Sequence, residues 1–306
     1  MPLPADIAEL QRLPLAELMQ RALATKLSRR GTSFSFCSII NAKSGRCSED
    51  CRFCVQSSHY RTEAPIYPLL DRDTVLSAAQ EAQKIGASHF SLVTSGRGLS
   101  AKERPQVAEL IAAIKKEVDI KVCASLGILR EDEFRELKEA GLSRYHHNLE
   151  TSAEHFPRVC TTHSFADRLH TINAAHAAGL SVCSGGIFGL GESEEDRLSM
   201  AASLLECGVD SVPINILVPL AGTPFAHLQP PGAHEILRAI ALYRLILPTV
   251  TIRLAAGRES ALADFLSSAF LAGADGMMIG GYLTQKGRPP EADRAFAREI
   301  QEIWST

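Results

Sequence analysis

Three cysteines gathered within eight residues are the strongest chemical signal in the chain. Cys47, Cys51 and Cys54 occupy the stretch Cys-Ser-Glu-Asp-Cys-Arg-Phe-Cys, directly after a β-rich segment. Three thiolates so close can hold one metal centre, whereas disulfide pairing would leave one thiol over. A structural zinc site usually has four ligands from two paired knuckles, and no second C-x-x-C or H-x₃-H pattern occurs. An iron–sulfur cube held by three cysteines would leave one iron open to a substrate or cofactor.

The segments that must position these cysteines alternate regularly along the chain. Apolar β-rich stretches and amphipathic helical stretches recur roughly every 30–35 residues, which is typical of repeated βα units. The predicted strands are Phe34–Asn41, His89–Thr94, Ile120–Ser125, Arg144–Asn148, Ser181–Gly186, Ser211–Leu217, Thr251–Leu254 and Met277–Ile279. The predicted helices are Asp73–Ile85, Pro105–Val118, Arg130–Ala140, Phe165–Ala178, Glu194–Cys207, Ala233–Leu245 and Ser260–Ala272. Eight such units favour a closed TIM-type (β/α)₈ barrel, an α/β fold, with an open doubly wound sheet as the alternative.

The chain as a whole has the composition of a folded protein. Its 306 residues are 45% hydrophobic and 22% charged, which excludes disorder as the main state. A formal net charge of -3 provides no basic footprint for nucleic acid. We expect a cytoplasmic protein, because no run approaches the ~18 apolar residues of a membrane span and no signal peptide is recognisable. We predict a single domain, 1–306, made of a helical extension (1–30, with an amphipathic helix at 3–25), a barrel core (35–285) and a closing helix (286–306, helical at 291–304).

A second group of cysteines is predicted inside the barrel. Cys123 and Cys183 occupy matching places on the third and fifth predicted strands. Inward residues in such barrels form layers of four from alternate strands, so the first and seventh strands would add Cys37 and Arg253. A lone buried cysteine is usually an inert, small apolar residue. A buried guanidinium, however, needs a negative partner, and a thiolate-bound metal cluster would be one.

The motif and its flanks resemble a known family. C-x₃-C-x₂-C after the first strand of a βα barrel resembles the radical S-adenosylmethionine (SAM) superfamily. Within that superfamily, several blocks resemble the biotin synthase family, and they cover roughly residues 35–285. The longest are residues 41–58 (NAKSGRCSEDCRFCVQSS), 145–152 (YHHNLETS), 182–192 (VCSGGIFGLGE) and 252–259 (IRLAAGRE), with shorter ones at 212–215 and 222–224.

The resemblance implies an activity and its cofactors. Cys47, Cys51 and Cys54 would hold a [4Fe-4S] cluster whose open iron binds SAM. Cleavage of SAM would give a 5′-deoxyadenosyl radical that removes hydrogen from dethiobiotin, and an auxiliary iron–sulfur cluster would donate the sulfur that makes biotin. The implied partners are a flavodoxin- or ferredoxin-type electron donor, the iron–sulfur assembly machinery and a second copy of the chain.

The resemblance also implies contacts for SAM and for the substrate. Phe53 matches a position near the adenine, and the glycine-rich run with Gly186, Ile187 and Gly189 matches an adenine-contacting segment. Alone, such a run is typical of a tight βα turn. The remaining matches are Thr94 and Ser95 for the methionyl amine, Arg168 for the SAM carboxylate, Glu150 for the ribose, Asn148 for both SAM and substrate, and Asn215 for the ureido ring.

The sequence departs from the family pattern at the auxiliary site. Ser91 stands on the second strand where the family usually has a cysteine, and Cys37 on the first strand could restore the third sulfur ligand. The hypothesis is an auxiliary cluster, [2Fe-2S] or a larger four-iron type, bound by Cys37, Cys123 and Cys183 beside Arg253. Ligation through the Ser91 oxygen is the alternative, less suited to iron–sulfur chemistry.

Other departures keep two alternative functions open. Glu150 replaces an aspartate and His146 an asparagine, which allows an enzyme on the same scaffold with another substrate. A non-catalytic iron–sulfur or zinc-binding scaffold is the second alternative. We interpret Cys160 and Cys207 as structural, and we expect His146 and its neighbour His147 to point to opposite faces of a strand.

Overall fold

The protein is a parallel β-barrel surrounded by helices. The computed structural model describes residues 5–283 and 287–305. Within these ranges, nine strands pair in the order β5-β4-β3-β2-β1-β9-β8-β7-β6, and a further pairing of β5 with β7 at Cys183 and Ser211 closes the ring. The strands are β1 Ser35–Lys43, β2 His89–Thr94, β3 Lys121–Ser125, β4 Arg144–His146, β5 Ser181–Cys183, β6 Gly186–Phe188, β7 Ser211–Ile216, β8 Thr251–Leu254 and β9 Gly276–Met278. The predicted TIM-type α/β barrel is confirmed, and the open sheet is excluded.

One predicted strand is divided in two. The stretch predicted as Ser181–Gly186 forms β5 up to Cys183, and β6 begins at Gly186. Between them the chain passes close to β7, because a Cβ on Gly185 would lie 2.0 Å from the Pro213 carbonyl oxygen. Only glycine permits this approach, so the closing strand bends where the barrel seals.

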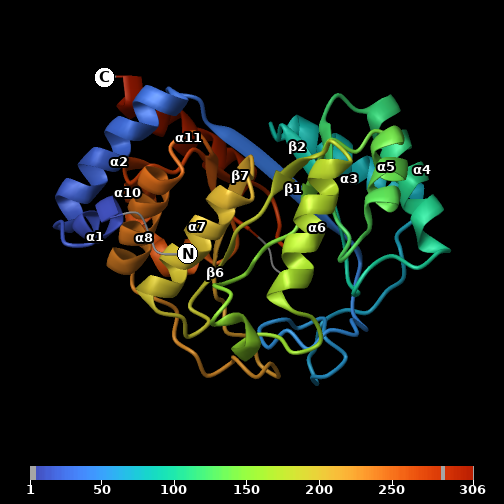
Figure 1. Ribbon diagram of the computed structural model, residues 1–306. Coiled ribbons are helices and arrows are strands. Elements are labelled where there is room, and N and C mark those ends of the chain that lie inside the picture. The colour runs from blue at the N-terminus through green and yellow to red at the C-terminus, as the bar shows by residue number, and fades with distance from the viewer. Residues whose placement is uncertain (1–4, 284–286, 306) are drawn as a thin grey trace.

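Helices cover the outside of the barrel, with α7, α8, α10 and α11 on one side of the strands in Figure 1 and α3 to α6 on the other. Several start on hydrogen-bonding caps. Ser164 and Asp167 form a capping box at α6, and Ser193 and Asp196 form one at α7. The helices that follow the strands are α3 Arg72–Lys84, α4 Glu103–Glu117, α5 Glu131–Glu139, α6 Phe165–Ala177, α7 Glu194–Glu206 and α8 Ala233–Ile246. These agree with the predicted helices to within two residues at either end.

Two predicted helices are interrupted. The N-terminal helix predicted over 3–25 is two helices, α1 Ala5–Leu10 and α2 Leu15–Arg30, because Pro14 has no N–H to continue the first one. The helix predicted over Ser260–Ala272 is divided into α9 Arg258–Leu262, the 3₁₀ turn η2 Ala263–Phe265 and α10 Leu266–Leu271. The break falls at Ala263, whose φ is 42°. The parts of the predicted extension, core and closing segments at 1–4, 284–286 and 306 lie outside the described residues.

The apolar core lies between the sheet and the helices, not inside the barrel. Outward-facing strand residues such as Phe90, Val122 and Ile252 are buried in one cluster with the inner faces of the helices. The alternate residues point inward, and many of them are polar or sulfur-bearing. The last helix, α11 Pro290–Ser305, completes the described fold. No helix within the described ranges is long and apolar enough to cross a membrane. The barrel therefore supplies a polar interior for chemistry.

Candidate active site

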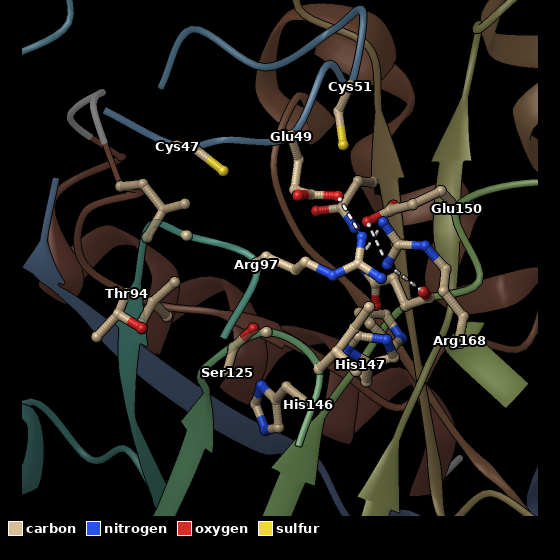
Figure 2. Close-up of a pocket in the computed structure, with 18 of the residues that line it drawn as sticks. Cys47, Glu49, Cys51, Thr94, Arg97, Ser125, His146, His147, Glu150 and Arg168 are labelled. Carbon is tan, nitrogen blue, oxygen red and sulfur yellow. Dashed lines mark hydrogen bonds and ion pairs between the residues drawn. The ribbon is translucent and has the colours of Figure 1, made fainter. Parts of the chain in front are cut away.

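A cavity of about 280 Å³ opens at the carboxyl ends of the strands. Thr94, Ser125, Asn215 and Ala255 line it, and each of them lies at or just after the last residues of its strand. Active sites of TIM-type barrels lie at this end. Figure 2 shows polar side chains from several strands converging there.

The cysteine loop covers the cavity. Cys47 and Cys51 line it, and Figure 2 shows both sulfurs projecting from the loop toward the strands. Hydrogen bonds fold the loop on itself: the Cys47 N–H donates to the Gln56 carbonyl at 2.9 Å, and the Ser58 N–H donates to the Cys47 carbonyl at 2.8 Å. Cys54 closes a tight turn, its N–H donating to the Cys51 carbonyl at 3.0 Å. The loop thus holds three thiols at the mouth of the barrel.

Two of the three loop thiols, those of Cys51 and Cys54, have a raised pKa in the absence of a metal. Desolvation raises the pKa of Cys54 to about 11, so the free thiol stays neutral at pH 7. The pKa of Cys51 is also raised, first by its hydrogen bond with Cys160 and then by burial. A metal ion removes this penalty because it deprotonates the thiol that it binds. The donor set therefore fits the predicted iron–sulfur group.

A second hollow of about 330 Å³ adjoins the first. It is lined by Phe53, Cys54 and Ile187, and it shares Asn148 and Asn215 with the first cavity, as well as Ser125, Glu150 and Leu283. Phe53 and Ile187 also pack against an apolar cluster at its edge, made of Val159, Leu190, Leu217 and Phe225. The structure brings together one aromatic, one aliphatic and two amide side chains beside the cysteine loop, a surface that fits a purine and its polar substituents.

An ion pair stands between the two hollows. The Arg168 guanidinium lies 3.8 Å from the Glu150 carboxylate and donates to the Asn148 carbonyl at 2.7 Å. Glu150 has a φ of 70°, in the left-handed region that residues other than glycine rarely adopt. Burial raises the pKa of Glu150, although Arg168 opposes the shift. Three predicted residues thus share one charged corner of the site.

The hydroxyls of Thr94 and Ser95 are used differently in the structure. Thr94 lines the cavity, and its buried Oγ1 has no hydrogen-bond partner in the part of the chain described. Ser95 instead donates from Oγ to the Gly45 carbonyl at 2.7 Å and so ties the cysteine loop to β2. An unsatisfied buried hydroxyl needs a partner. Thr94 therefore has a fully unpaired hydroxyl at the cavity, whereas the Ser95 hydroxyl has used its donor and keeps only its lone pairs for a ligand.

Gly186 and Gly189 do not line either hollow. A Cβ on Gly186 would lie 2.4 Å from the Glu150 carbonyl, so this glycine allows the chain after β4 to pack onto β6. Gly189 has a φ of 103°, and its N–H donates to the Glu192 carboxylate at 2.9 Å. Both glycines shape the turn that presents Ile187.

The second predicted group lies deeper, inside the barrel. Cys37, Cys123, Cys183 and Arg253 are all buried and come from β1, β3, β5 and β8. Burial, which is the largest cause, raises the pKa of Cys123 to about 12; Arg144 and Arg253 oppose the shift, and the neighbouring Cys183 and Cys37 add to it. Ser91 is paired with Cys123 across the sheet, 1% exposed, and its Oγ has no partner among the described side chains and backbone. Thiols and an orphaned hydroxyl in one place fit a bound cluster better than an empty core.

Sequence analysis missed a second cation at this inner group. Arg144 on β4 is paired with Cys123, and it lowers the pKa of Cys123 and of Cys183 against the effect of burial. Its Nε donates to the Ser181 hydroxyl at 3.0 Å. Arg144 lies two residues before His146 and hence on the same face of the strand, and this spacing could have identified it from the sequence as an inward-facing residue.

His146, His147 and Cys160 all lie near the cavity or the cysteine loop. Both histidines line the cavity, but with different neighbours: His146 lies near Arg144 and Arg253, whereas His147 lies near Arg168 and stacks with Tyr145. These surroundings agree with the expectation that the two histidines point to opposite faces of the strand. Cys160 lies with its Sγ 3.7 Å from that of Cys51, so its place is beside the metal loop. Hydrogen bonding with Cys51 lowers the pKa of Cys160 to about 4. Cys207 follows α7 and is half-buried.

Comparison with known families and proteins supports the same chemistry. Residues 42–216 match the model of the radical SAM superfamily, and residues 213–301 match the biotin and thiamin synthesis associated domain. The chain is 50% identical over 287 residues to the biotin synthase of Pelotomaculum thermopropionicum, covering 94% of this chain and 89% of that protein. It is 52% identical over 268 residues to the biotin synthase of Thermotoga petrophila, covering 87% and 89%.

Solved structures of lower identity share the fold. Methylornithine synthase superposes with a TM-score of 0.81 at 19% identity, covering 98% of this chain and 92% of that one. The hydrogenase maturase HydG from Carboxydothermus hydrogenoformans gives a TM-score of 0.78 at 20% identity, covering 98% and 77%. At these identities the likeness extends to the barrel only.

Proposed function

Because this chain belongs to the biotin synthase family of the radical SAM superfamily, it inserts sulfur into dethiobiotin, and we propose which of its residues hold the groups that this reaction uses. Its cofactors are a [4Fe-4S] cluster, SAM and an auxiliary iron–sulfur cluster. When bound, they supply a 5′-deoxyadenosyl radical at one end of the site and sulfur at the other. None of the comparisons favours another substrate or a non-catalytic scaffold. The observation that carries the proposal is a cysteine loop that lines a cavity at one end of the barrel, together with three further buried thiols that lie near one another on the barrel strands.

We assign the loop cysteines to the [4Fe-4S] cluster. Cys47, Cys51 and Cys54 are fixed by backbone hydrogen bonds, and Ser95 anchors the loop to β2 through the Gly45 carbonyl. Three protein sulfurs leave one iron without a protein ligand, as SAM binding requires.

SAM would occupy the two adjoining hollows. Arg168 would pair with its carboxylate, and the free Thr94 hydroxyl would accept a hydrogen bond from its amine. Glu150 and Asn148 would bind the ribose side, with Phe53 and Ile187 packing on the adenine.

Dethiobiotin would lie between SAM and the barrel floor. Asn215 sits at the end of β7, donating to the Gly186 carbonyl at 3.2 Å and accepting from the Ala256 N–H at 3.2 Å. These bonds hold the amide plane at the edge of the cavity with a lone pair and an N–H still open. Asn148, held by the Gly185 N–H at 3.2 Å, would contact the substrate from the other side. Both amides suit a ureido ring.

The auxiliary cluster would be held by Cys37, Cys123 and Cys183, with Arg253 facing it. The Arg253 guanidinium lies 3.5 Å from the Ser35 carbonyl and is 4% exposed, so it is buried without a carboxylate partner in the described structure. A negatively charged cluster would supply that partner. Three sulfur ligands and two cations, Arg253 and Arg144, suit either a [2Fe-2S] or a larger four-iron centre.

Iron and sulfide counts with Mössbauer spectra test this assignment. The wild type and Cys37→Ala are purified without oxygen, with Cys207→Ala as the matched control for loss of a cysteine. We expect Cys37→Ala to keep the loop cluster, to lose auxiliary iron, and to cleave SAM without forming biotin. A Cys37→Ala protein with the full auxiliary iron content and spectrum would refute the ligand set.

The reductant, the oligomeric state and the location follow from the family alone. We propose a small flavodoxin- or ferredoxin-type donor, iron–sulfur assembly machinery as the source of both clusters, a homodimer, and residence in the cytoplasm. Sedimentation of the loaded protein tests the dimer, and a monomer at micromolar concentration would refute it.

A further inference from the structure

A compact group of metal ligands lies beside the radical SAM loop and includes two residues that the known chemistry does not use. The ligand atoms of Cys51, Cys160 and His163 all lie within 4.8 Å of one another. Among the described residues, the three loop cysteines form no group so compact, which agrees with their holding a wider multi-iron centre. Cys51 therefore belongs to two different arrangements of ligands.

The distances in this group match a single tetrahedral ion. Zinc bound at ~2.3 Å to two thiolates and ~2.0 Å to an imidazole places the sulfurs ~3.8 Å apart and sulfur and nitrogen ~3.5 Å apart. Here the Cys51 and Cys160 sulfurs are 3.7 Å apart, and Cys160 Sγ is 3.3 Å from His163 Nδ1. Little movement of the protein would be needed to bind the ion.

A carboxylate lies beside the histidine of this group. Glu49 Oε2 lies 2.5 Å from His163 Nδ1, and the two side chains are 7% and 5% exposed. Thr162 Oγ1 donates to the same oxygen at 2.9 Å and fixes its direction. Glu49 is not a member of the compact group, so the ligands are two thiolates and one imidazole, a three-ligand set that zinc sites complete with water.

The surrounding backbone holds the group in place from two separate loops. Asp50 Oδ1 accepts from the N–H groups of Thr161 at 2.8 Å and Thr162 at 3.1 Å, and so clamps the loop before α6 onto the cysteine loop. The Arg52 N–H donates to the Val159 carbonyl at 2.9 Å, and Arg97 donates to the Thr162 carbonyl at 2.7 Å. The ligands are therefore preorganised across 109 residues of chain between Cys51 and Cys160.

We propose that the chain, before its loop cluster is assembled, binds one zinc-class divalent ion through Cys51, Cys160 and His163, and that this ion and the [4Fe-4S] cluster exclude each other. The exclusion follows because both need the Cys51 sulfur. The site is thus a point at which zinc competes with cluster assembly. Only the exclusion rests on the proposed function; the ion site stands on its own ligands.

Cobalt titration of the full-length chain, purified without clusters and kept reduced, tests the ion site. Tetrahedral thiolate coordination gives intense visible and near-ultraviolet bands. We expect Cys160→Ser and His163→Gln each to weaken this binding by more than the ~10–100-fold that loss of an outer-shell partner costs. Cys54→Ser, which removes a cluster ligand outside the group, is expected to keep the cobalt spectrum, as is the control Cys207→Ala. Melting curves verify that each variant is folded.

The opposite pattern would overturn the proposal. If Cys160→Ser and His163→Gln keep the wild-type cobalt affinity while Cys54→Ser loses it, the ion binds the cluster cysteines instead. In the exclusion arm, iron and sulfide are added to the same chain with and without zinc. We expect zinc to lower iron uptake in the wild type and not in Cys160→Ser. Equal inhibition in both proteins would refute the exclusion and leave the proposed function untouched.

Discussion

The two groups of cysteines are held in opposite ways. Cys47, Cys51 and Cys54 lie on one irregular loop, half-buried, at the open end of the barrel. Cys37, Cys123 and Cys183 lie on three separate strands, buried in the interior. Loops can adjust around an incoming group, whereas strands fix their side chains before it arrives. The difference suits a site that must bind and release SAM and a site that must hold sulfur at one place.

The largest effect is expected from removing a loop ligand. Cys54→Ser leaves two sulfurs for the loop cluster, and because all radical chemistry starts there, both SAM cleavage and biotin formation should fall to background. The loop lies outside the apolar core, so the melting temperature of the cluster-free chain should change by less than about 2 °C. Iron analysis and calorimetry measure the two quantities. Retention of half the wild-type SAM cleavage would contradict the assignment of Cys54.

Removing Arg253 should impair sulfur insertion without stopping SAM cleavage. Arg253→Met leaves the charge of the auxiliary cluster without its nearest proposed partner, and breaking such a buried pair costs about 3–5 kcal/mol. Auxiliary iron and biotin yield should fall strongly, while SAM cleavage at the loop cluster continues. Arg253→Lys, which keeps the charge, is the matched control and should retain more auxiliary iron. Equal auxiliary iron in wild type and Arg253→Met would show that the charge of Arg253 does not stabilise the auxiliary cluster.

The contrast between the regions also explains what the sequence could and could not predict. The loop motif is contiguous, so its spacing alone indicated a cluster. The interior group was predictable because glycine-punctuated βα repeats placed Cys123 and Cys183 on the same face of the sheet: Cys123 is level with Ser181 through Arg144, and Cys183 follows two residues later. Arg144 was missed because a charged residue at a strand start usually faces water. The contact of Cys51 with Cys160 joins loops from different βα units, and no local pattern encodes it.

Substitutions of Asn215 and Asn148 should affect the binding of dethiobiotin and of SAM differently. Asn215→Ala removes one amide, and leaving a partner unpaired costs about 1–3 kcal/mol, or roughly a 5–150-fold rise in KM for dethiobiotin. KM for SAM should stay within about twofold. Asn148→Ala is the comparison, because that amide faces both ligands and both constants should rise. An unchanged KM for dethiobiotin in Asn215→Ala would show that the ureido ring lies elsewhere.

The last contrast is a pH dependence of stability to which His146 in the barrel interior contributes. Burial first, and then Arg144 and Arg253, lower the pKa of His146 to about 3 from its usual 6.5. Between these values the unfolded chain binds a proton that the folded, cluster-free chain does not, so stability falls as the pH drops from about 6.5 toward 3. One such group contributes a slope of up to ~1.4 kcal/mol per pH unit. His146→Asn should reduce the measured slope of the unfolding free energy by that amount. Cys54→Ser, in the loop, should leave the slope unchanged, and an equal slope in wild type and His146→Asn would mean that the barrel interior admits the charged imidazole.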